Sequence, residues 1–179
     1  MNHRGAVDNW TGIVALAHVY RTMGKFSHRK NVLFVAFDHE EDGLNGSRMM
    51  AKAITKEEIP QYCGMINIDS FGLAGPFALA SSSSPTLVRL SEETAEALKV
   101  PFYKVSLGNA DADSSSFVAR DIPAVTLSGL SKDWDSILHS RNDQADKIQA
   151  ISVYLGYRMA LSRFARMDEA PCNAFAPRK

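Results

Sequence analysis

One set of side chains in this chain suits metal chemistry, and it consists of carboxylates and a single imidazole. Each member lies beside a segment that we expect to be a strand or the start of a helix, and the members are Asp8, Glu40, Glu41, Asp69, Asp113 and His139. Carboxylates that are brought together repel one another and resist desolvation unless protons or cations neutralise them. Carboxylates with an imidazole are a ligand set typical of zinc, and two metals that share a carboxylate hold both a nucleophile and a substrate carbonyl. The set therefore predicts a divalent-metal site.

The adjacent acids Glu40 and Glu41 cannot easily do the same task. Consecutive residues of an extended chain point in opposite directions. One of the two can bind metal while the other faces the attacking water as a general base.

Each of these residues also has an ordinary structural interpretation. Asp8 is then the N-cap of the helix that follows it, and Asp113 caps its own helix. The other acids and the histidines are then turn or solvent-facing residues, which applies to Glu40, Glu41, Asp69, His39, His139 and His3. These interpretations leave the shared placement of the set unexplained.

Helical and strand periods alternate along the chain. Helices are predicted over 10–24, 44–54, 85–99, 113–120 and 144–166, and strands over 31–37, 64–69, 102–106 and 123–128. The first helix should bury one face, which carries Ile13, Leu16, Ala17, Tyr20 and Met23. The continuous apolar run at 31–37 is typical of a strand covered on both faces. The polar residues 81–84 are interpreted as a surface loop.

This alternation favours an α/β fold in three α/β/α layers, with a mostly parallel mixed sheet and helices on both faces. In such sheets, functional sites lie beyond the carboxyl ends of the strands. Five of the six chemically active positions end, follow or flank a predicted strand, so the sheet can bring the set together at one edge.

Composition excludes several partners. The chain has 179 residues with 20 basic and 20 acidic side chains, so it carries neither a nucleic-acid footprint nor a patch for a membrane surface. No apolar stretch approaches the roughly 18 residues of a membrane-spanning helix, and residues 1–10 lack the apolar region of a secretory signal. We expect one domain over 1–167 and a polar tail over 168–179 that frays.

The two cysteines, Cys63 and Cys172, lack the spacing of a metal site. Cys63 opens an apolar run and is expected to be a small buried thiol. The redox compartment therefore stays open at this stage.

Five segments, in this order, resemble the zinc exopeptidases of clan MH. This group includes bacterial secreted aminopeptidases, glutamate carboxypeptidase II and, more distantly, glutaminyl cyclase. The segments are GAVDNWTGI (5–13), VLFVAFDHEEDGLNGSRMMA (32–51), INIDSFG (66–72), ADSSSFVARDIPAVTLS (112–128) and LHSRNDQADKI (138–148). The resemblance implies the zinc exopeptidase (phosphorylase/hydrolase-like) fold.

The resemblance also implies a role for each matching residue. Asp8 would bridge two zinc ions, Glu41 and His139 would complete the first site, and Asp69 would bind the second zinc. Glu40 would be the catalytic general base for a metal-bridging water that attacks a peptide carbonyl. The remaining candidates for a contact with substrate or with the ligands are Asp113 and His39.

The function implied is a metal-dependent exopeptidase, foremost an aminopeptidase that removes N-terminal residues from a peptide substrate. Three alternatives stay open: a carboxypeptidase, a glutaminyl-cyclase-like acyltransferase, and a catalytically impaired member that acts as a binding module. Relatives are often secreted or periplasmic, but neither the location nor the oligomeric state of this chain follows from its sequence.

The resemblance fails at one zinc ligand. The second zinc should have a histidine from a His-x-Asp segment upstream of the bridging aspartate, and here His3 is the sole candidate, without a following Asp. We therefore expect a second site that is incomplete in this chain, and a chain that lacks the first strands of the fold. Smaller departures are Leu138 and Ser114, which stand where some relatives have Tyr and His.

Overall fold

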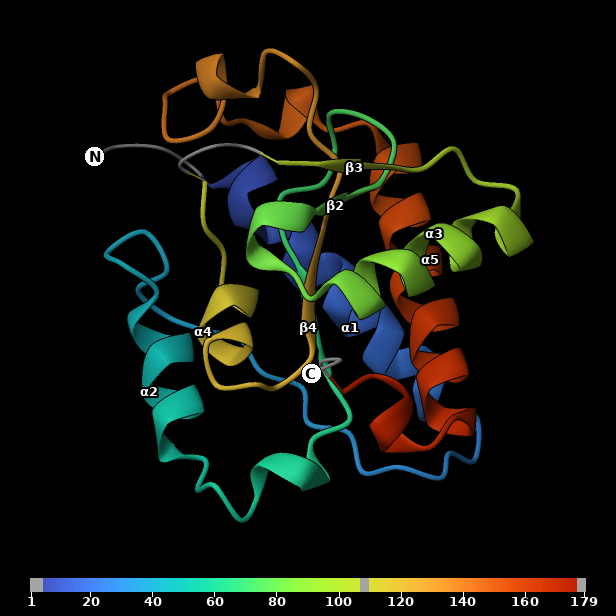
Figure 1. Cartoon of the computed structure of the whole chain (residues 1–179). Coiled ribbons are helices and arrows are strands. Elements are labelled where there is room, and N and C mark those ends of the chain that lie inside the picture. The colour runs from blue at the N-terminus through green and yellow to red at the C-terminus, as the bar shows by residue number, and fades with distance from the viewer. Residues whose placement is uncertain (1–4, 107–109, 177–179) are drawn as a thin grey trace.

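The computed structural model of the chain describes residues 5–106 and 110–176, and it has the predicted α/β architecture (Figure 1). Its helices and strands are α1 (Thr11–Met23), α2 (Asn45–Ala53), β1 (Met65–Ile68), β2 (Phe77–Leu79), α3 (Pro85–Leu98), β3 (Tyr103–Val105), α4 (Ser114–Val118), β4 (Ala124–Ser128) and α5 (Ala150–Glu169). A helical turn, η1 (Ala6–Trp10), precedes α1. Among the described helices, none combines the length and the apolar character needed to cross a membrane.

The four strands form one mixed sheet in the order β1-β4-β2-β3. β1 is parallel to β4, β2 is parallel to β3, and β2 is antiparallel to β4. β2 was not predicted, because a run of three apolar residues is too short to show the alternation that distinguishes a strand from other buried segments. The mixed, mostly parallel sheet is confirmed.

Helices cover both faces of the sheet, which confirms the three layers. Along β4, Val125 and Leu127 pack into the core cluster formed with α1, α3 and α5. Their neighbour Ala124 packs into a second cluster with α2 and α4. Alternate residues of a strand face opposite sides, so this division places the two groups of helices on opposite faces (Figure 1).

The glycine in the first turn of α1 lets that helix approach the end of β1. A β-carbon at Gly12 would overlap the backbone oxygen of Ile68 and Oδ1 of Asn9. Gly12 N–H also donates to Oδ1 of Asn9 (3.0 Å). No larger residue fits there unless the helix shifts away from the strand.

Replacing Gly12 with alanine is therefore expected to lower the free energy of unfolding by about 1–3 kcal/mol, the usual cost of overpacking. Gly24→Ala is the matched control, because a β-carbon at Gly24 meets its nearest atom at 3.7 Å. Urea unfolding followed by circular dichroism measures both variants. Equal losses in the two variants would contradict the close approach of α1 and β1.

The strand predicted at 31–37 is wrong. The segment runs in extended coil, and none of its backbone groups bonds to another part of the described chain. The apolar run is only partly covered, and Leu33 is 69% exposed. A strand requires a partner as well as an apolar pattern, and no described strand lies beside this segment.

Some local expectations are corrected as well. The buried face of α1 carries Ala15, Val19 and Met23, whereas the predicted Ile13 and Tyr20 are exposed. This happens because α1 packs on α5 and β1 along one stripe only. The serines of 82–84 are buried. The hydroxyl groups of Ser83 and Ser84 accept hydrogen bonds from backbone N–H groups of β4. They extend the sheet's hydrogen bonding instead of forming a surface loop.

The C-terminal region also differs from expectation. α5 begins at Ala150 rather than at residue 144. The tail does not fray over residues 170–176, because Phe175 is buried and Cys172 forms a disulfide with Cys63. The two cysteines are therefore not separate thiols, and their bond closes a loop across 109 positions that sequence spacing could not reveal.

Candidate metal centre

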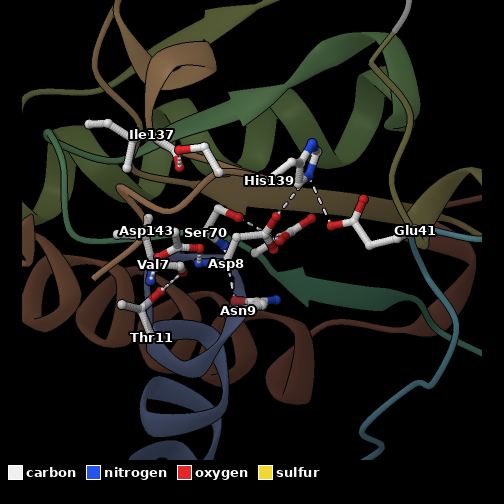
Figure 2. Close-up of polar contacts among 11 residues, drawn as sticks. Val7, Asp8, Asn9, Thr11, Glu41, Ser70, Ile137, His139 and Asp143 are labelled. Carbon is white, nitrogen blue, oxygen red and sulfur yellow. Dashed lines mark hydrogen bonds and ion pairs between the residues drawn. The ribbon is translucent and has the colours of Figure 1, made fainter. Parts of the chain in front are cut away.

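Asp8 is held in place by a buried carboxylate far along the chain. Asp143 is fully buried, and its two oxygens accept the backbone N–H groups of Val7 (2.5 Å) and Asp8 (3.2 Å). The hydroxyl of Thr11 donates to the backbone oxygen of Val7 (2.7 Å). The turn η1 is thus fixed on both sides, and the side chain of Asp8 points toward His139 (Figure 2).

Asn9 connects the same turn to the carboxyl end of β1. Its Nδ2 donates to the backbone oxygen of Ile68 (3.3 Å), and its Oδ1 accepts N–H groups from Ser70 (3.1 Å) and Gly12 (3.0 Å). Ser70 in turn donates to Oδ1 of Asp69 (3.1 Å). Asp8 and Asp69 are therefore placed by one hydrogen-bonded unit.

His139 is brought to Asp8 by hydrophobic packing. Val7 and Leu138 are both buried in one small core cluster. Each of these core residues is followed directly by a polar one, Asp8 after Val7 and His139 after Leu138. Burial of the pair therefore places a carboxylate and an imidazole side by side at the edge of the core. Leu138, which stands where some relatives have tyrosine, is therefore a core residue in this chain.

Asp8, Glu41 and His139 form a compact ligand group. Nε2 of His139 lies 3.1 Å from Oδ2 of Asp8 and 2.9 Å from Oε1 of Glu41 (Figure 2). One ligand atom from each residue lies within 4.8 Å of the others. Three predicted ligands from three distant segments thus converge with an N,O,O donor set, which suits zinc with a position left open.

The chain turns at Glu40 and Glu41 instead of staying extended, and only Glu41 belongs to the ligand group. The backbone oxygen of Glu40 accepts N–H groups from Gly43 (3.0 Å) and Leu44 (2.8 Å). Burial, and next the negative charge of Asp69, raise the pKa of Glu40 to about 8. Glu40 is therefore half-buried among carboxylates, while Glu41 meets the imidazole.

Asp69 lies near the ligand group but outside it. Burial, and next the charge of Asp8, raise the pKa of Asp69 to about 7. Its nearest described hydrogen-bond donor is the hydroxyl of Ser70. Asp69 and Asp8 together offer carboxylate oxygens for a second ion. His3, the remaining candidate for that ion, lies outside the described residues.

Asp113 does not cap α4, contrary to expectation. No side-chain bond joins it to the helix, and its Oδ1 is buried without a hydrogen-bond partner among the described residues. Burial raises the pKa of Asp113, a hydrogen bond from Ser47 partly opposes this effect, and the charge of Asp111 adds to it. It also lies close enough to Glu40 to raise the pKa of that group. Asp113 therefore faces the acidic set.

These observations fit a cation. Several carboxylates are crowded and partly desolvated, and the one described imidazole among them is that of His139. Such a set is unfavourable unless protons or a metal offset the repulsion. The buried Oδ1 of Asp113, which has no hydrogen-bond partner within residues 5–106 and 110–176, indicates the same need for positive charge.

The candidate His39 and the departure Ser114 both lie outside the ligand group. His39 is exposed, and its ring contacts Asp42 (2.9 Å) and Asp38 (3.3 Å) instead of the ligand group. The Asp42 hydrogen bond, and next the Asp38 charge, raise the pKa of His39. Ser114, where relatives have His, is buried against Ser82 and Thr126.

The raised pKa values predict how the stability of the metal-free protein depends on pH. Between about pH 5 and neutral pH, Glu40 and Asp69 bind protons in the native state that the unfolded chain has already released. The free energy of unfolding should therefore fall as pH rises from about 5 to about 8. Urea unfolding in a chelator measures this slope.

Asp69→Asn should flatten that slope, because it removes one of the two shifted groups. The control is Asp38→Asn, at a side chain that is 89% exposed. A slope that rises with pH, or one that Asp69→Asn leaves unchanged, would contradict the crowding of these carboxylates.

Sequence reasoning missed two residues that hold the site together, Asp143 and Asn9. Both lie inside segments that carried the resemblance, but neither was assigned a role. The available signal for Asp143 was its place four residues after His139. Its contact with Val7 spans 136 positions, so only the fold reveals it.

Comparison with known proteins shows the family and the fold of the chain. The profile of Peptidase family M28 matches residues 1–156. The structure is similar to an aminopeptidase from Aneurinibacillus sp. strain AM-1, with a TM-score of 0.76, 23% identity, and coverage of 99% of this chain and 41% of that one. It is also similar to the LapA aminopeptidase of Legionella pneumophila, with a TM-score of 0.84, 19% identity, and coverage of 94% and 48%.

A glutaminyl cyclase from an Acidobacteriales bacterium has the same fold. Its TM-score is 0.73 at 16% identity, with coverage of 94% of this chain and 64% of that one. The chain thus spans less than half the length of the two aminopeptidases and about two thirds of the cyclase. At these identities, the structural likeness shows the fold alone.

Proposed function

The chain belongs to peptidase family M28, and from this membership we propose that it is a zinc-dependent aminopeptidase that removes N-terminal residues from peptides. The observation that carries the proposal is the convergence of Asp8, Glu41 and His139 with Glu40 directly beside them. These residues combine a metal-ligand set with a candidate base.

The convergence of three side chains supports the first set of ligand roles, in which Asp8, Glu41 and His139 would hold one zinc ion. Asp69, whose pKa is raised by the charge of Asp8, would serve with Asp8 for a second ion. In the described residues the second site has carboxylates only, and we expect it to bind more weakly than the first. When bound, zinc polarises a carbonyl group and lowers the pKa of a water molecule.

Glu40 is the residue proposed to move the proton. A carboxylate oxygen of Glu40 takes a proton from the water that attacks the peptide carbonyl carbon, and it returns the proton to the leaving amine. Without metal, its pKa is raised to about 8, so much of it is protonated at neutral pH. Positive charge at Asp8 and Asp69 offsets the repulsion and leaves Glu40 ionised as a base.

Asp143 and Asn9 are positioning residues in this mechanism. Asp143 holds the backbone of Asp8, and Asn9 sets the distance between Asp8 and the end of β1. Neither touches substrate. They keep two ligands from distant segments in one arrangement, which a catalytic metal site requires.

Hydrolysis of leucine p-nitroanilide tests the function directly. We expect turnover that a chelator abolishes and that added zinc restores. Acetyl-leucine p-nitroanilide, whose amino terminus is blocked, is the matched control and should not be cleaved. Cleavage of the blocked substrate would exclude an aminopeptidase.

The similarity to a glutaminyl cyclase favours one second candidate. Cyclisation of an N-terminal glutaminyl peptide, with release of ammonia and no hydrolysis of the p-nitroanilide, would replace the proposal. Zinc binding without either reaction would favour a binding module.

A further inference from the structure

The disulfide joins the C-terminal tail to a segment that leads to the metal centre. Cys172 lies in the turn η6 (Cys172–Ala174), which packs against η2 (Ile59–Gln61) (Figure 1). Cys63 lies just before β1, and β1 leads directly to Asp69. The bond therefore ties the tail to the start of a strand whose other end is at the metal centre.

The same tail holds a second segment that leads to the metal centre. The carboxylate of Asp168, near the end of α5, accepts the backbone N–H groups of Arg29 (2.9 Å) and Lys30 (2.8 Å). Nζ of Lys30 donates to the backbone oxygens of Asp168 (2.6 Å) and Ala170 (2.7 Å). The chain that follows these contacts, residues 31–41, carries both glutamates of the metal centre.

Residues 168–176, which we call the clasp, thus hold the starts of both segments. The clasp is closed by one covalent bond, at Cys172, and by noncovalent contacts, chiefly those of Lys30 and of Phe175, which is 5% exposed. Breaking the covalent bond leaves only the noncovalent contacts. Because chain ends with few buried contacts open locally at low cost, the clasp can open while the rest of the fold persists.

The surroundings of the disulfide favour exchange with a thiol. Cys63 and Cys172 are both partly exposed, so a small thiol can reach them. The ammonium group of Lys30 is held at Ala170, two residues before Cys172. Positive charge near a sulfur stabilises the thiolate that leaves in thiol–disulfide exchange. We therefore expect Cys172 to be the leaving group and the sulfur of Cys63 to be attacked.

We propose that the Cys63–Cys172 disulfide is a redox-sensitive clasp, which a dithiol opens, and that its opening loosens the segments leading to Glu41 and Asp69 and weakens zinc binding. A thiolate of the dithiol attacks Sγ of Cys63, the S–S bond breaks, and its electron pair goes to Sγ of Cys172, which takes up a proton. The second thiolate of the dithiol attacks the mixed disulfide and releases Cys63, which also takes up a proton. The cysteine pair gains two electrons and the dithiol becomes a cyclic disulfide.

Reduction of the folded protein by dithiothreitol tests the exchange, in a chelator and without zinc. Alkylation followed by mass spectrometry should find both cysteines blocked before reduction and both alkylated after it, while circular dichroism stays unchanged. Reduction only at urea concentrations that unfold the chain would make the bond a permanent cross-link and would overturn the proposal.

Glutathione, a monothiol, identifies the sulfur that is attacked. The mixed disulfide that it forms should lie on Cys63, with Cys172 free for alkylation, in at least about tenfold excess over the opposite adduct. Peptide mapping measures the ratio. An adduct chiefly on Cys172 would contradict the stabilisation of the leaving thiolate by Lys30.

Hydrogen exchange shows whether the clasp opens. In the reduced protein, amides of residues 29–30, 62–65 and 168–176 should exchange at least about tenfold faster than in the oxidised protein, and those of β2 within about twofold. Reoxidised protein is the control and should exchange as it did before reduction. Reduction without faster exchange in these three segments would overturn the clasp.

The effect on zinc rests on the proposed function and is measured apart from it. The double variant Cys63→Ser, Cys172→Ser keeps the clasp open and has no thiol that could bind zinc. Its zinc affinity, from competition with a chromophoric chelator, should be about tenfold below that of the oxidised wild type. Equal affinity would overturn the link to the metal centre. A wild type that binds no zinc would contradict the proposed function instead, and the exchange experiments would still decide whether the clasp opens.

Discussion

Replacing Glu40 with glutamine is expected to lower kcat for leucine p-nitroanilide by about a hundredfold to ten-thousandfold while zinc content stays unchanged. Glutamine keeps the size and the hydrogen bonding of the side chain, but it cannot accept the proton of the attacking water. The half-buried Glu40 side chain lies outside the group of three ligands, so the variant should hold zinc as the wild type does. Steady-state kinetics and metal analysis of the same preparation measure both quantities.

The matched control is Asp38→Asn, two residues away in the same turn. Asp38 is exposed, and its contacts are with His39. That variant should keep near-normal kcat. Near-wild-type turnover by Glu40→Gln would remove Glu40 from the mechanism, and a large loss of zinc in that variant would make it a ligand instead.

Replacing His139 with alanine is expected to weaken zinc binding by more than about a hundredfold. Loss of a partner that only orients a ligand already costs about 10–100-fold in affinity, and this variant removes a ligand itself. His139 contributes the only nitrogen donor of the group. Competition with a chromophoric chelator measures the affinity in both proteins.

His39→Ala is the matched control for that experiment. Both rings are substantially exposed and each contacts two carboxylates, but those around His39 are Asp38 and Asp42. The variant should bind zinc as the wild type does. Equal losses in the two variants, or no loss at His139, would contradict the ligand group.

The main elements of the fold could be predicted because their signals are local. The spacing of apolar residues predicted the ends of α2, α3, β1 and β4 to within a few residues. Two elements could not be predicted in this way. β2 is too short to have a period, and residues 31–37 have the pattern of a strand but pair with no strand in the described parts of the chain. A sequence shows which face a segment should bury, but not whether the covering segment is present.

The candidate site was predictable because its residues lie in segments that follow one another in the order found in the zinc exopeptidases. Asp8, Glu41 and His139 were predicted as ligands, and the structure brings them together. That they bind zinc stays a prediction. The residues that hold these ligands in place were not predictable. Asp143 accepts a hydrogen bond from Val7 across 136 positions of the sequence, and Leu138 shares a core cluster with Val7.

Local rules also misjudged Asp113. An aspartate directly before a helix is typical of an N-cap, yet Oδ1 of Asp113 has no hydrogen-bond partner among the described residues, and the carboxyl group faces the acidic set. The competing requirement is electrostatic. A buried carboxylate near Glu40 is tolerated when a cation is nearby, and the helix keeps its first turn without the cap.

Zinc content of the chain is the most direct test of the central claim, that Asp8, Glu41 and His139 form a zinc site. The protein is saturated with zinc, dialysed against metal-free buffer and measured by mass spectrometry of the metal. We predict about one to two zinc ions per folded wild-type chain. The ion held by Asp8, Glu41 and His139 should be lost in Asp8→Ala and retained in His39→Ala. A wild-type chain that is folded by circular dichroism and yet retains no zinc would contradict the account.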